Sequence, residues 1–236
     1  MAILNMTPDS FYAGSRLASL DDLTTAAKTA LANGATMLDL GGCSTRPNSQ
    51  PVDAETEWKR VEPALAVLRQ SFPDATLSLD TFRPEIAQRA IEQFGQIIIN
   101  DISGGCEAMF SLVREKHVPY VWTLRGNYSL LDSIERMKGI DLILDPGFGF
   151  TGGVDQDYEC MRRMDQLQAY QLPILVGVSR KSMLFRLLDL TPETSLSATQ
   201  VLHLYALQHG ATILRVHDVA EAMQTLTLYN KLYSNI

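Results

Sequence analysis

Short apolar runs alternate with segments of helical periodicity along the whole chain. The runs predict strands over 2–4, 37–40, 77–80, 97–101, 119–124, 140–145, 174–178 and 212–216. Between them, apolar residues recur three and four positions apart, which predicts helices beginning near 19, 53, 84, 109, 129, 156, 183 and 219. Ser19 is the expected N-cap of the first, the sixth is expected over 156–169, and the seventh unit continues in a second helix over 195–208. Eight strand and helix units are typical of a (β/α)8 TIM barrel, an α/β fold, and we expect residues 1–236 to form one such domain.

The polar residues at the strand ends favour a closed barrel over an open sheet. An open doubly wound sheet would also alternate strands with helices, but it gathers its polar residues at one switch point, whereas polar residues here end many successive strands.

The fifth helix has only about ten residues, 129–138, available to it. A crossover that short can barely cover its pair of strands, so we expect a shortened fifth helix and a weakened barrel wall there.

Composition narrows the class of protein. With 236 residues, 46% of them hydrophobic, the chain can bury a full core. A net charge of −7 without a Lys/Arg-rich run argues against nucleic acid or an acidic membrane as partner. No apolar run reaches the length of a membrane span, and no secretion signal is evident. The three cysteines lie far apart, which favours the reducing cytoplasm over a disulfide framework or zinc site.

Polar side chains stand where the predicted strands end. In a barrel these ends converge on one mouth, so scattered residues would ring a single pocket. Acids and amides end the earlier strands and suit a heterocycle that presents N–H donors, whereas bases end the last two strands, where barrels often bind phosphate. We therefore expect a phosphate-bearing heterocycle to be bound by Asn5, Asp80, Asn100, Asp145, Lys181, Arg215 and His217.

The neighbouring residues in the sequence favour different roles for the acidic residues. Asp80 and Asp145 end apolar runs with no adjacent base, which favours a role in ligand binding. Asp39 is expected instead to pair with a loop amide or a residue of the neighbouring strand. Asp101 stays open between the two, because it follows Asn100 and should point to the opposite side of its strand.

Lys181 allows two chemistries. Arg180 and the flanking Ser179 and Ser182 favour an anion site. A Schiff-base lysine, as in an aldolase-like barrel, would require burial that lowers its pKa. Cys43 has no neighbouring histidine to activate it and is expected to be a bystander.

Seven segments, in order and spanning the chain from end to end, resemble dihydropteroate synthases. They are Ile3-Leu4-Asn5-Met6-Thr7-Pro8-Asp9-Ser10-Phe11, Gly41-Gly42-Cys43-Ser44-Thr45-Arg46-Pro47, Ser78-Leu79-Asp80-Thr81, Ile99-Asn100-Asp101-Ile102-Ser103-Gly104-Gly105, Leu144-Asp145-Pro146-Gly147-Phe148-Gly149-Phe150, Val178-Ser179-Arg180-Lys181-Ser182 and Arg215-Val216-His217-Asp218. The first and last distinguish this family from related barrel methyltransferases.

The resemblance implies condensation of 6-hydroxymethyl-7,8-dihydropterin diphosphate with 4-aminobenzoate, a Mg²⁺-assisted transferase step of folate biosynthesis that sulfonamides target. It implies Asn5 as metal ligand, and Arg215 and His217 at the diphosphate. The residues implied at the pterin are Asp80, Asn100, Asp145 and Lys181, and those at the substrate more generally, chiefly on the aminobenzoate side, are Phe11, Thr45, Arg46, Pro47, Phe150 and Ser182. A cytoplasmic homodimer, assembled through late helices, is also implied.

Three departures from the family pattern keep an alternative open. Thr123 stands where a histidine is usual, Gly152 and its neighbours replace a usual lysine, and the fifth helix is short. A catalytically silent, pterin-binding paralogue would retain the strand-end residues and lose turnover.

Overall fold

The computed structural model describes residues 1–6, 19–42, 52–125 and 130–233. Six parallel strands pair in chain order, namely β1 (Ala2–Asn5), β2 (Met37–Gly41), β3 (Thr76–Asp80), β4 (Ile98–Asp101), β5 (Tyr120–Thr123) and β6 (Leu142–Asp145). A further pair is formed by β7 (Leu175–Val176) and β8 (Ile213–Leu214), each shorter than its apolar run predicts.

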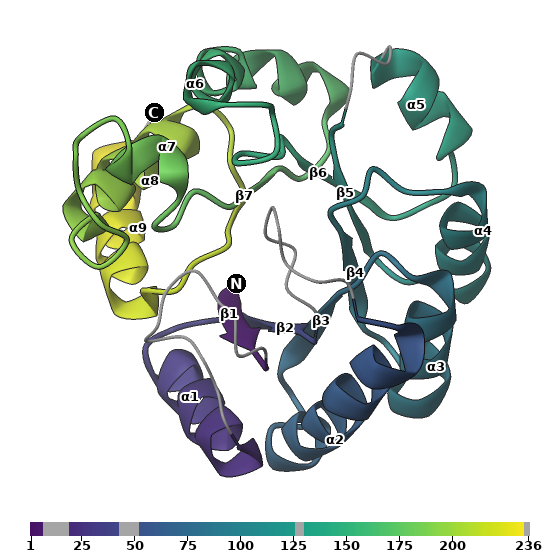
Figure 1. Ribbon diagram of the computed structural model, residues 1–236. Helices are drawn as coiled ribbons and strands as arrows, with labels where there is room; N and C mark the ends of the chain where they lie inside the picture. Colours follow the sequence, from purple (N-terminus) through teal and green to yellow (C-terminus); the bar gives the residue numbers. More distant parts are fainter. Residues whose placement is uncertain (7–18, 43–51, 126–129, 234–236) are drawn as a thin grey trace.

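Backbone hydrogen bonds join the short pair to the six-stranded sheet on both sides. The Leu144 N–H donates to the Pro173 carbonyl at 2.8 Å, and the Ile3 N–H donates to the Val216 carbonyl at 2.9 Å. The strands therefore form a ring with helices outside it, as Figure 1 shows. This confirms the (β/α)8 barrel and excludes the open sheet, because β8 lies beside β1.

Helices follow the strands where the periodicity predicts them. They are α1 (Leu20–Ala32), α2 (Ala54–Ser71), α3 (Pro84–Phe94), α4 (Glu107–Lys116), α5 (Leu130–Arg136), α6 (Val154–Arg162), α7 (Ser182–Phe185), α8 (Leu196–Gln208) and α9 (Val219–Tyr233). The Ser19 hydroxyl accepts the Asp22 N–H at 3.1 Å and caps α1 as its sequence predicts. The single helix expected over 156–169 is wrong: α6 ends at Arg162, and a 3-10 helix, η2 (Met164–Tyr170), follows it.

Helix α5 is seven residues long, as the shortened fifth helix requires. The strands beside it are nevertheless covered, because Trp122, Leu142 and Leu144 on β5 and β6 are all buried. Arg114 of α4 donates to the carbonyls of Arg136 and Lys138 and so ties the end of α5 to its neighbour. The expectation of a weakened wall stays a prediction.

The two faces of the strands differ in kind. Leu38 and Leu40 pack in the core between the sheet and the helices, as do Leu77 and Leu79. Because successive side chains alternate, Asp39 and the other polar positions in register with it face the barrel interior. A smaller apolar cluster that includes Ile98, Val121, Ile143 and Leu175 fills the other end of the interior. In the described part of the chain, no helix combines the length and apolarity that crossing a membrane requires.

Candidate active site

Arg215 lies at the centre of the candidate site. Its Nε donates to Asp39 Oδ2 at 2.7 Å, and its Nη2 donates to Asp80 Oδ2 at 2.9 Å. Burial opposes the guanidinium charge, but the carboxylates of Asp39 and Asp80 outweigh it and raise the pKa of Arg215. A base that follows β8 therefore lies directly between an acid of β2 and an acid of β3.

Asp39 is a fully buried junction of hydrogen bonds. Besides Arg215, it accepts the Ser78 hydroxyl at 2.5 Å and the Asn100 amide at 3.2 Å. Ser78 lies on the adjacent strand, so Asp39 pairs across strands as its sequence context predicts. Its carboxylate thus holds β2, β3, β4 and the end of β8 in one arrangement, and its role is structural.

Two acceptor oxygens remain inside this network. Asp80 Oδ1 and Asn100 Oδ1 are buried and accept no hydrogen bond from the described residues. A buried acceptor without a donor is costly, so both oxygens favour a ligand that presents N–H groups. Burial, and then the charges of Asp39, Glu57 and Asp101, raise the pKa of Asp80 to about 7 against the opposing effect of Arg215.

Asp145 is oriented by two short contacts at the end of β6. Its Oδ2 accepts the Thr123 hydroxyl at 3.2 Å, and its Oδ1 accepts the Gly147 N–H at 2.9 Å. Gly147 adopts φ +78°, a conformation that side chains disfavour. Thr123, a departure from the family pattern, is thus fully buried and in direct contact with a candidate ligand-binding carboxylate.

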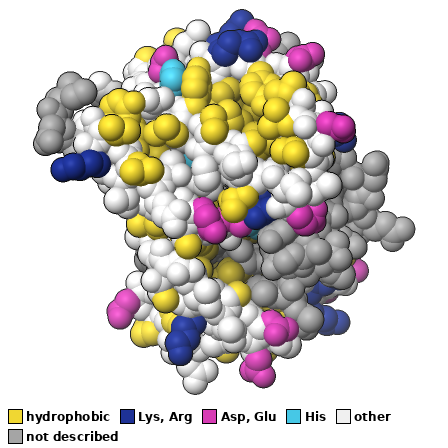
Figure 2. Space-filling model, turned by 90° about the vertical axis from the view of Figure 1, so that its left-hand side faces the viewer, with side chains coloured by type: hydrophobic (Ala, Val, Ile, Leu, Met, Phe, Trp, Pro, Cys, Tyr) yellow, Lys and Arg dark blue, Asp and Glu magenta, His cyan; other side chains and the backbone are white. Residues whose placement is uncertain are grey.

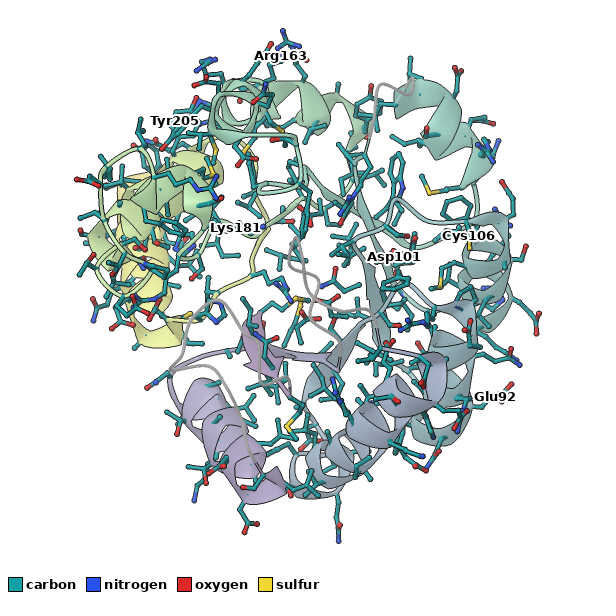
Figure 3. All side chains as sticks on the ribbon, viewed as in Figure 1. Glu92, Asp101, Cys106, Arg163, Lys181 and Tyr205 are labelled. Carbon is teal, nitrogen blue, oxygen red and sulfur yellow. The ribbon has the colours of Figure 1, made fainter. Side chains whose placement is uncertain are left out.

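Lys181 points into the ring of strands from the end of the β7 loop, whereas Arg163 and Glu92 extend outwards (Figure 3). Its Nζ donates to the Phe148 carbonyl and lies 5.1 Å from the centre of the Phe150 ring, against which Arg125 also packs. Burial, partly offset by Asp145, lowers the pKa of Lys181 to about 8. The ammonium form still predominates at neutral pH, which suits anion or carbonyl binding better than a Schiff base.

His217 follows β8, and its backbone N–H donates to the Ser179 hydroxyl at 3.2 Å. Burial and the nearby Arg215 guanidinium lower the pKa of His217 to about 4, so its imidazole is neutral at pH 7. It can therefore donate a hydrogen bond to an anion but adds no charge. Arg180 binds Asp218 instead of facing the candidate site, so the expectation that it strengthens an anion site is wrong.

The structure places the remaining predicted residues unevenly. Asn5 ends β1, and its Oδ1 lies close to Gly41. A side chain in place of Gly41 would contact both Asn5 and Asp80. Ser182 begins α7 directly after Lys181. Asp101 faces away from Asn100, accepts the Tyr120 hydroxyl at 2.9 Å and is structural. Outside the described residues lie Phe11, Cys43, Thr45, Arg46 and Pro47.

Glu57 belongs to a network that the sequence reading missed. It is fully buried on α2, where it accepts the Thr81 hydroxyl at 2.7 Å and pairs with Arg83. Arg83 also donates to the Val52 carbonyl, while Arg60 donates to the Gly42 carbonyl at 3.1 Å. These contacts hold the described residues on both sides of 43–51. The signal was available, because Glu57 precedes Val61 by four positions and so falls on the buried stripe of α2.

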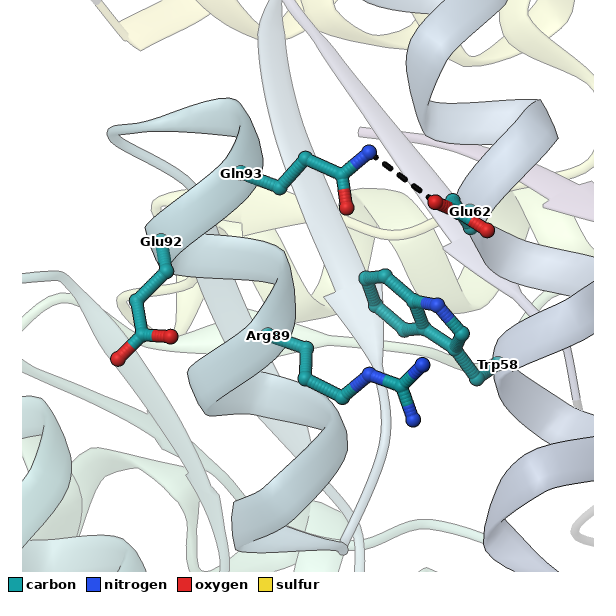
Figure 4. A pocket seen from close by; sticks show the side chains of 5 residues that line it. All are labelled: Trp58, Glu62, Arg89, Glu92 and Gln93. Carbon is teal, nitrogen blue, oxygen red and sulfur yellow. Dashed lines mark hydrogen bonds between the residues drawn. The ribbon is translucent and has the colours of Figure 1, made fainter.

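A shallow hollow on the outer surface lies apart from these residues, between α2 and α3 (Figure 4). Its polar groups are engaged with one another: the Gln93 amide donates to Glu62 at 3.1 Å, and Arg89 lies 4.4 Å from the Trp58 ring and pairs with Glu55. None of the predicted site residues lines this hollow. The strand-end cluster, with its unsatisfied acceptors and shifted pKa values, is therefore the better candidate.

The chain is similar to known proteins along most of its length. The model of the pterin binding enzyme family matches residues 1–129 and 131–217. The dihydropteroate synthase of Escherichia coli K12 is 33% identical over 96% of this chain and 88% of its own length. A folic acid synthesis protein of Pneumocystis carinii is 35% identical over all of this chain, which spans 36% of that longer protein. The crystal structure of Yersinia pestis dihydropteroate synthase with a sulfonamide drug superposes with a TM-score of 0.90, at 31% identity and with 100% and 93% of the two chains covered.

Proposed function

This chain belongs to the dihydropteroate synthase family of pterin-binding enzymes, and we propose that it joins 6-hydroxymethyl-7,8-dihydropterin diphosphate to 4-aminobenzoate. The products are 7,8-dihydropteroate and diphosphate, in folate biosynthesis. The observation that carries the proposal is the Arg215 bridge between Asp39 and Asp80, which brings a cation to the side of buried acceptor oxygens. One compact site can thereby receive both the N–H-bearing ring and the anionic leaving group.

We assign the pterin to the acidic side of the site. Asp80 Oδ1 and Asn100 Oδ1 would accept ring N–H groups, and Asp145 would accept from the amino edge of the ring. Lys181, whose Nζ already donates to a carbonyl, would donate to the ring oxygen. Because Asp80 has a pKa of about 7, ring N–H donors would stabilise its charged form and release a proton near neutral pH.

The diphosphate is assigned to Arg215 and His217. Arg215 supplies the charge and His217 a neutral hydrogen-bond donor, consistent with its pKa of about 4. In the described residues, no cluster of three or more His, Cys, Asp or Glu forms a protein cage for a metal. The single amide oxygen of Asn5 beside Asp80 fits Mg²⁺, which commonly keeps waters and substrate phosphates as its other ligands. Bound there, Mg²⁺ would neutralise charge on the diphosphate.

The chemistry needs no enzyme nucleophile. As the C–O bond to diphosphate breaks, the electron pair leaves with the diphosphate, and the positive charge on the methylene carbon spreads into the pterin ring. The carboxylates of Asp80 and Asp145 stabilise that charge, while Arg215 stabilises the departing oxygens. The aminobenzoate nitrogen then forms the new C–N bond and loses a proton. One network of side chains therefore places carboxylates at the pterin end of the substrate and Arg215 at its diphosphate end.

Purified chain, both substrates and Mg²⁺ provide the test. We expect dihydropteroate and diphosphate to appear in equal amounts, by chromatography and a coupled diphosphate assay. Calorimetry with a free pterin accompanies the assay. Pterin binding without any product would indicate a catalytically silent pterin-binding protein. Absence of both binding and product would reject the proposed function.

We also propose a homodimer in the cytoplasm. Figure 2 shows hydrophobic side chains gathered on the face formed by the late helices, where Val201 of α8 and Leu228 and Leu232 of α9 are 66%, 63% and 62% exposed. Such a patch favours a protein partner. Sedimentation should give twice the chain mass, and Leu228→Glu should reduce it to one chain mass.

A further inference from the structure

A buried ion pair joins the loop after β7 to the loop after β8. Arg180 Nε donates to Asp218 Oδ2 and Arg180 Nη2 donates to Asp218 Oδ1, each at 2.8 Å. The two side chains are only 6% and 13% exposed. Such a two-point contact fixes orientation as well as distance. Arg180 precedes Lys181 and Asp218 follows His217, so each member of the pair is the chain neighbour of a candidate site residue.

The other donors of Arg180 extend the contact to the segment before α8. Its Nη1 donates to the carbonyls of Pro192 and Glu193 at 2.7 and 2.8 Å. Its backbone N–H donates to the Thr199 hydroxyl at 3.2 Å, and that hydroxyl donates to the Ser195 carbonyl. The guanidinium is thus committed to protein acceptors on two sides.

The backbone at Arg180 adopts an unusual conformation. Its φ of +54° lies in the left-handed region, which residues other than glycine adopt infrequently. The turn determines where Lys181 starts, and the Lys181 side chain reaches the Phe148 carbonyl from that point. A strained turn, held by a buried ion pair and adjacent to a site residue, indicates a positioning role.

The strands themselves supply little support in this region. β7 and β8 share only two residue pairs, Leu175 with Ile213 and Val176 with Leu214. Past these pairs the Arg215 N–H still donates to the Val176 carbonyl at 2.9 Å, and beyond that bond side chains link the two loops. The Ser179 hydroxyl, which accepts the His217 N–H, provides one such link, and the Arg180–Asp218 pair provides the stronger one.

We propose that Arg180 and Asp218 are positioning residues for the transfer reaction. They fix Lys181 relative to His217, and so hold the group assigned to the pterin at a set distance from the group assigned to the diphosphate. This inference rests on the proposed function. Bond cleavage should depend on the Arg180–Asp218 pair more than substrate binding does. Each loop can still bind its own part of the substrate when the link between the loops is lost.

Three variants test the pair in the full-length chain with Mg²⁺ and both substrates. Asp218→Asn keeps the size and removes the charge, and Arg180→Lys keeps the charge and removes the two-point contact. Arg180→Gly accepts the left-handed turn freely and removes the side chain. We expect each to lower kcat about tenfold or more, with KM for the pterin diphosphate changed less than threefold. The double variant Arg180→Lys/Asp218→Asn should lose no more than the larger single loss, because both changes break one link.

The exposed pair Arg163–Glu159 supplies the matched control, because it has the same chemistry on the surface of α6. Arg163→Lys and Glu159→Gln should leave kcat within twofold of the native value. If Asp218→Asn does not fold, Ser179→Ala, which removes only the second link to His217, is measured in its place and should lower kcat severalfold.

Folded variants whose kcat and KM both stay within twofold of native would overturn the inference, as would an additive double variant. A loss of kcat that only tracks a fall in folded fraction, measured by circular dichroism, would likewise assign the pair to stability alone. The native chain is assayed in parallel. If it forms no dihydropteroate, the proposed function fails with it, whereas an active native chain with unaffected variants refutes the positioning role only.

Discussion

The two parts of the barrel hold their functional groups by different means. In β1–β6, strands of four or five residues pair continuously, and Asp80, Asn100 and Asp145 stand on inward positions that the pairing register fixes. In β7–β8, the strands are two residues long. There Lys181 and His217 come after the pairing has ended, and their loops are joined by the Arg180–Asp218 pair and the Ser179 hydroxyl.

The difference shows where each half can be damaged. A side chain on a paired strand keeps its position when a neighbouring side chain is changed, because many backbone hydrogen bonds hold the strand. A side chain on a loop that is held mainly by one ion pair loses its position when that pair is broken. Arg215 belongs to both systems, since it follows β8 and binds Asp39 and Asp80 on β2 and β3. Substitutions at these positions can break or sharpen the comparison.

Arg215→Ala should have the largest effect. It leaves the buried carboxylates of Asp39 and Asp80 without their cation, which we expect to cost about 3–5 kcal/mol of unfolding free energy, as for other broken buried pairs. Turnover should fall below detection through loss of the diphosphate site, while a free pterin should still bind to the folded fraction. Urea denaturation measures the first and calorimetry the last. A loss below about 1 kcal/mol, the range of surface pairs such as the Arg163→Ala control, would contradict the central role of Arg215.

Asp145→Asn should act on the ligand and spare the fold. The amide oxygen can still accept from the Gly147 N–H, and the amide NH2 can donate to the Thr123 hydroxyl, so the unfolding free energy should change little. Loss of the charged acceptor should weaken free pterin binding by about 1.5–3 kcal/mol, or roughly 10–150-fold, in calorimetry. An equal loss of stability would show that Asp145 supports the barrel and not the ligand.

Lowering the pH should change the unfolding free energy in opposite directions through His203 and Asp80. His203, buried on α8, has its pKa lowered by burial from 6.5 to about 4, so between these values the unfolded chain binds the extra proton and unfolding free energy falls as pH falls. Asp80 has its pKa raised from 3.8 to about 7, so in that window the folded chain binds the proton and unfolding free energy falls as pH rises. Each effect reaches about 1.4 kcal/mol per pH unit at most.

Urea denaturation between pH 4 and pH 8 separates the two contributions. His203→Gln should reduce the loss of stability on acidification, and Asp80→Asn should reduce the loss on raising the pH. Unchanged slopes in both variants would mean that other groups control the pH dependence.

Thr123→Val should have the smallest effect. It removes the hydroxyl that donates to Asp145 at 3.2 Å and keeps the volume nearly constant. We expect pterin affinity to fall by about 0.5–1.5 kcal/mol, in line with one neutral donor on a carboxylate that also binds Gly147. Measured affinity equal to that of the native chain would mean that the Gly147 N–H alone orients Asp145.

Much of this architecture can be read from the sequence because its signals are local. Apolar runs, helical spacing and the Ser19 cap predict the element order and the short fifth helix. The period-two alternation around Asp39 and around Asn100 predicts which polar side chains face inward and which face the helices. These signals fail at β7 and β8, where runs of five residues yield strands of only two, and at α6, where periodicity does not distinguish an α-helix from a following 3-10 helix.

The sequence by itself determined the barrel, the inward placement of the acids and the family, because these depend on spacing along the chain. Only the tertiary structure decided which charges meet. Arg215 and Asp39 are 176 positions apart and Arg180 and Asp218 are 38 apart, so no local pattern relates them. It also decided that Arg180 pairs with Asp218 between the loops after β7 and β8. Ion pairs and burial depend on distances across the fold, and these are set when the ring of strands closes.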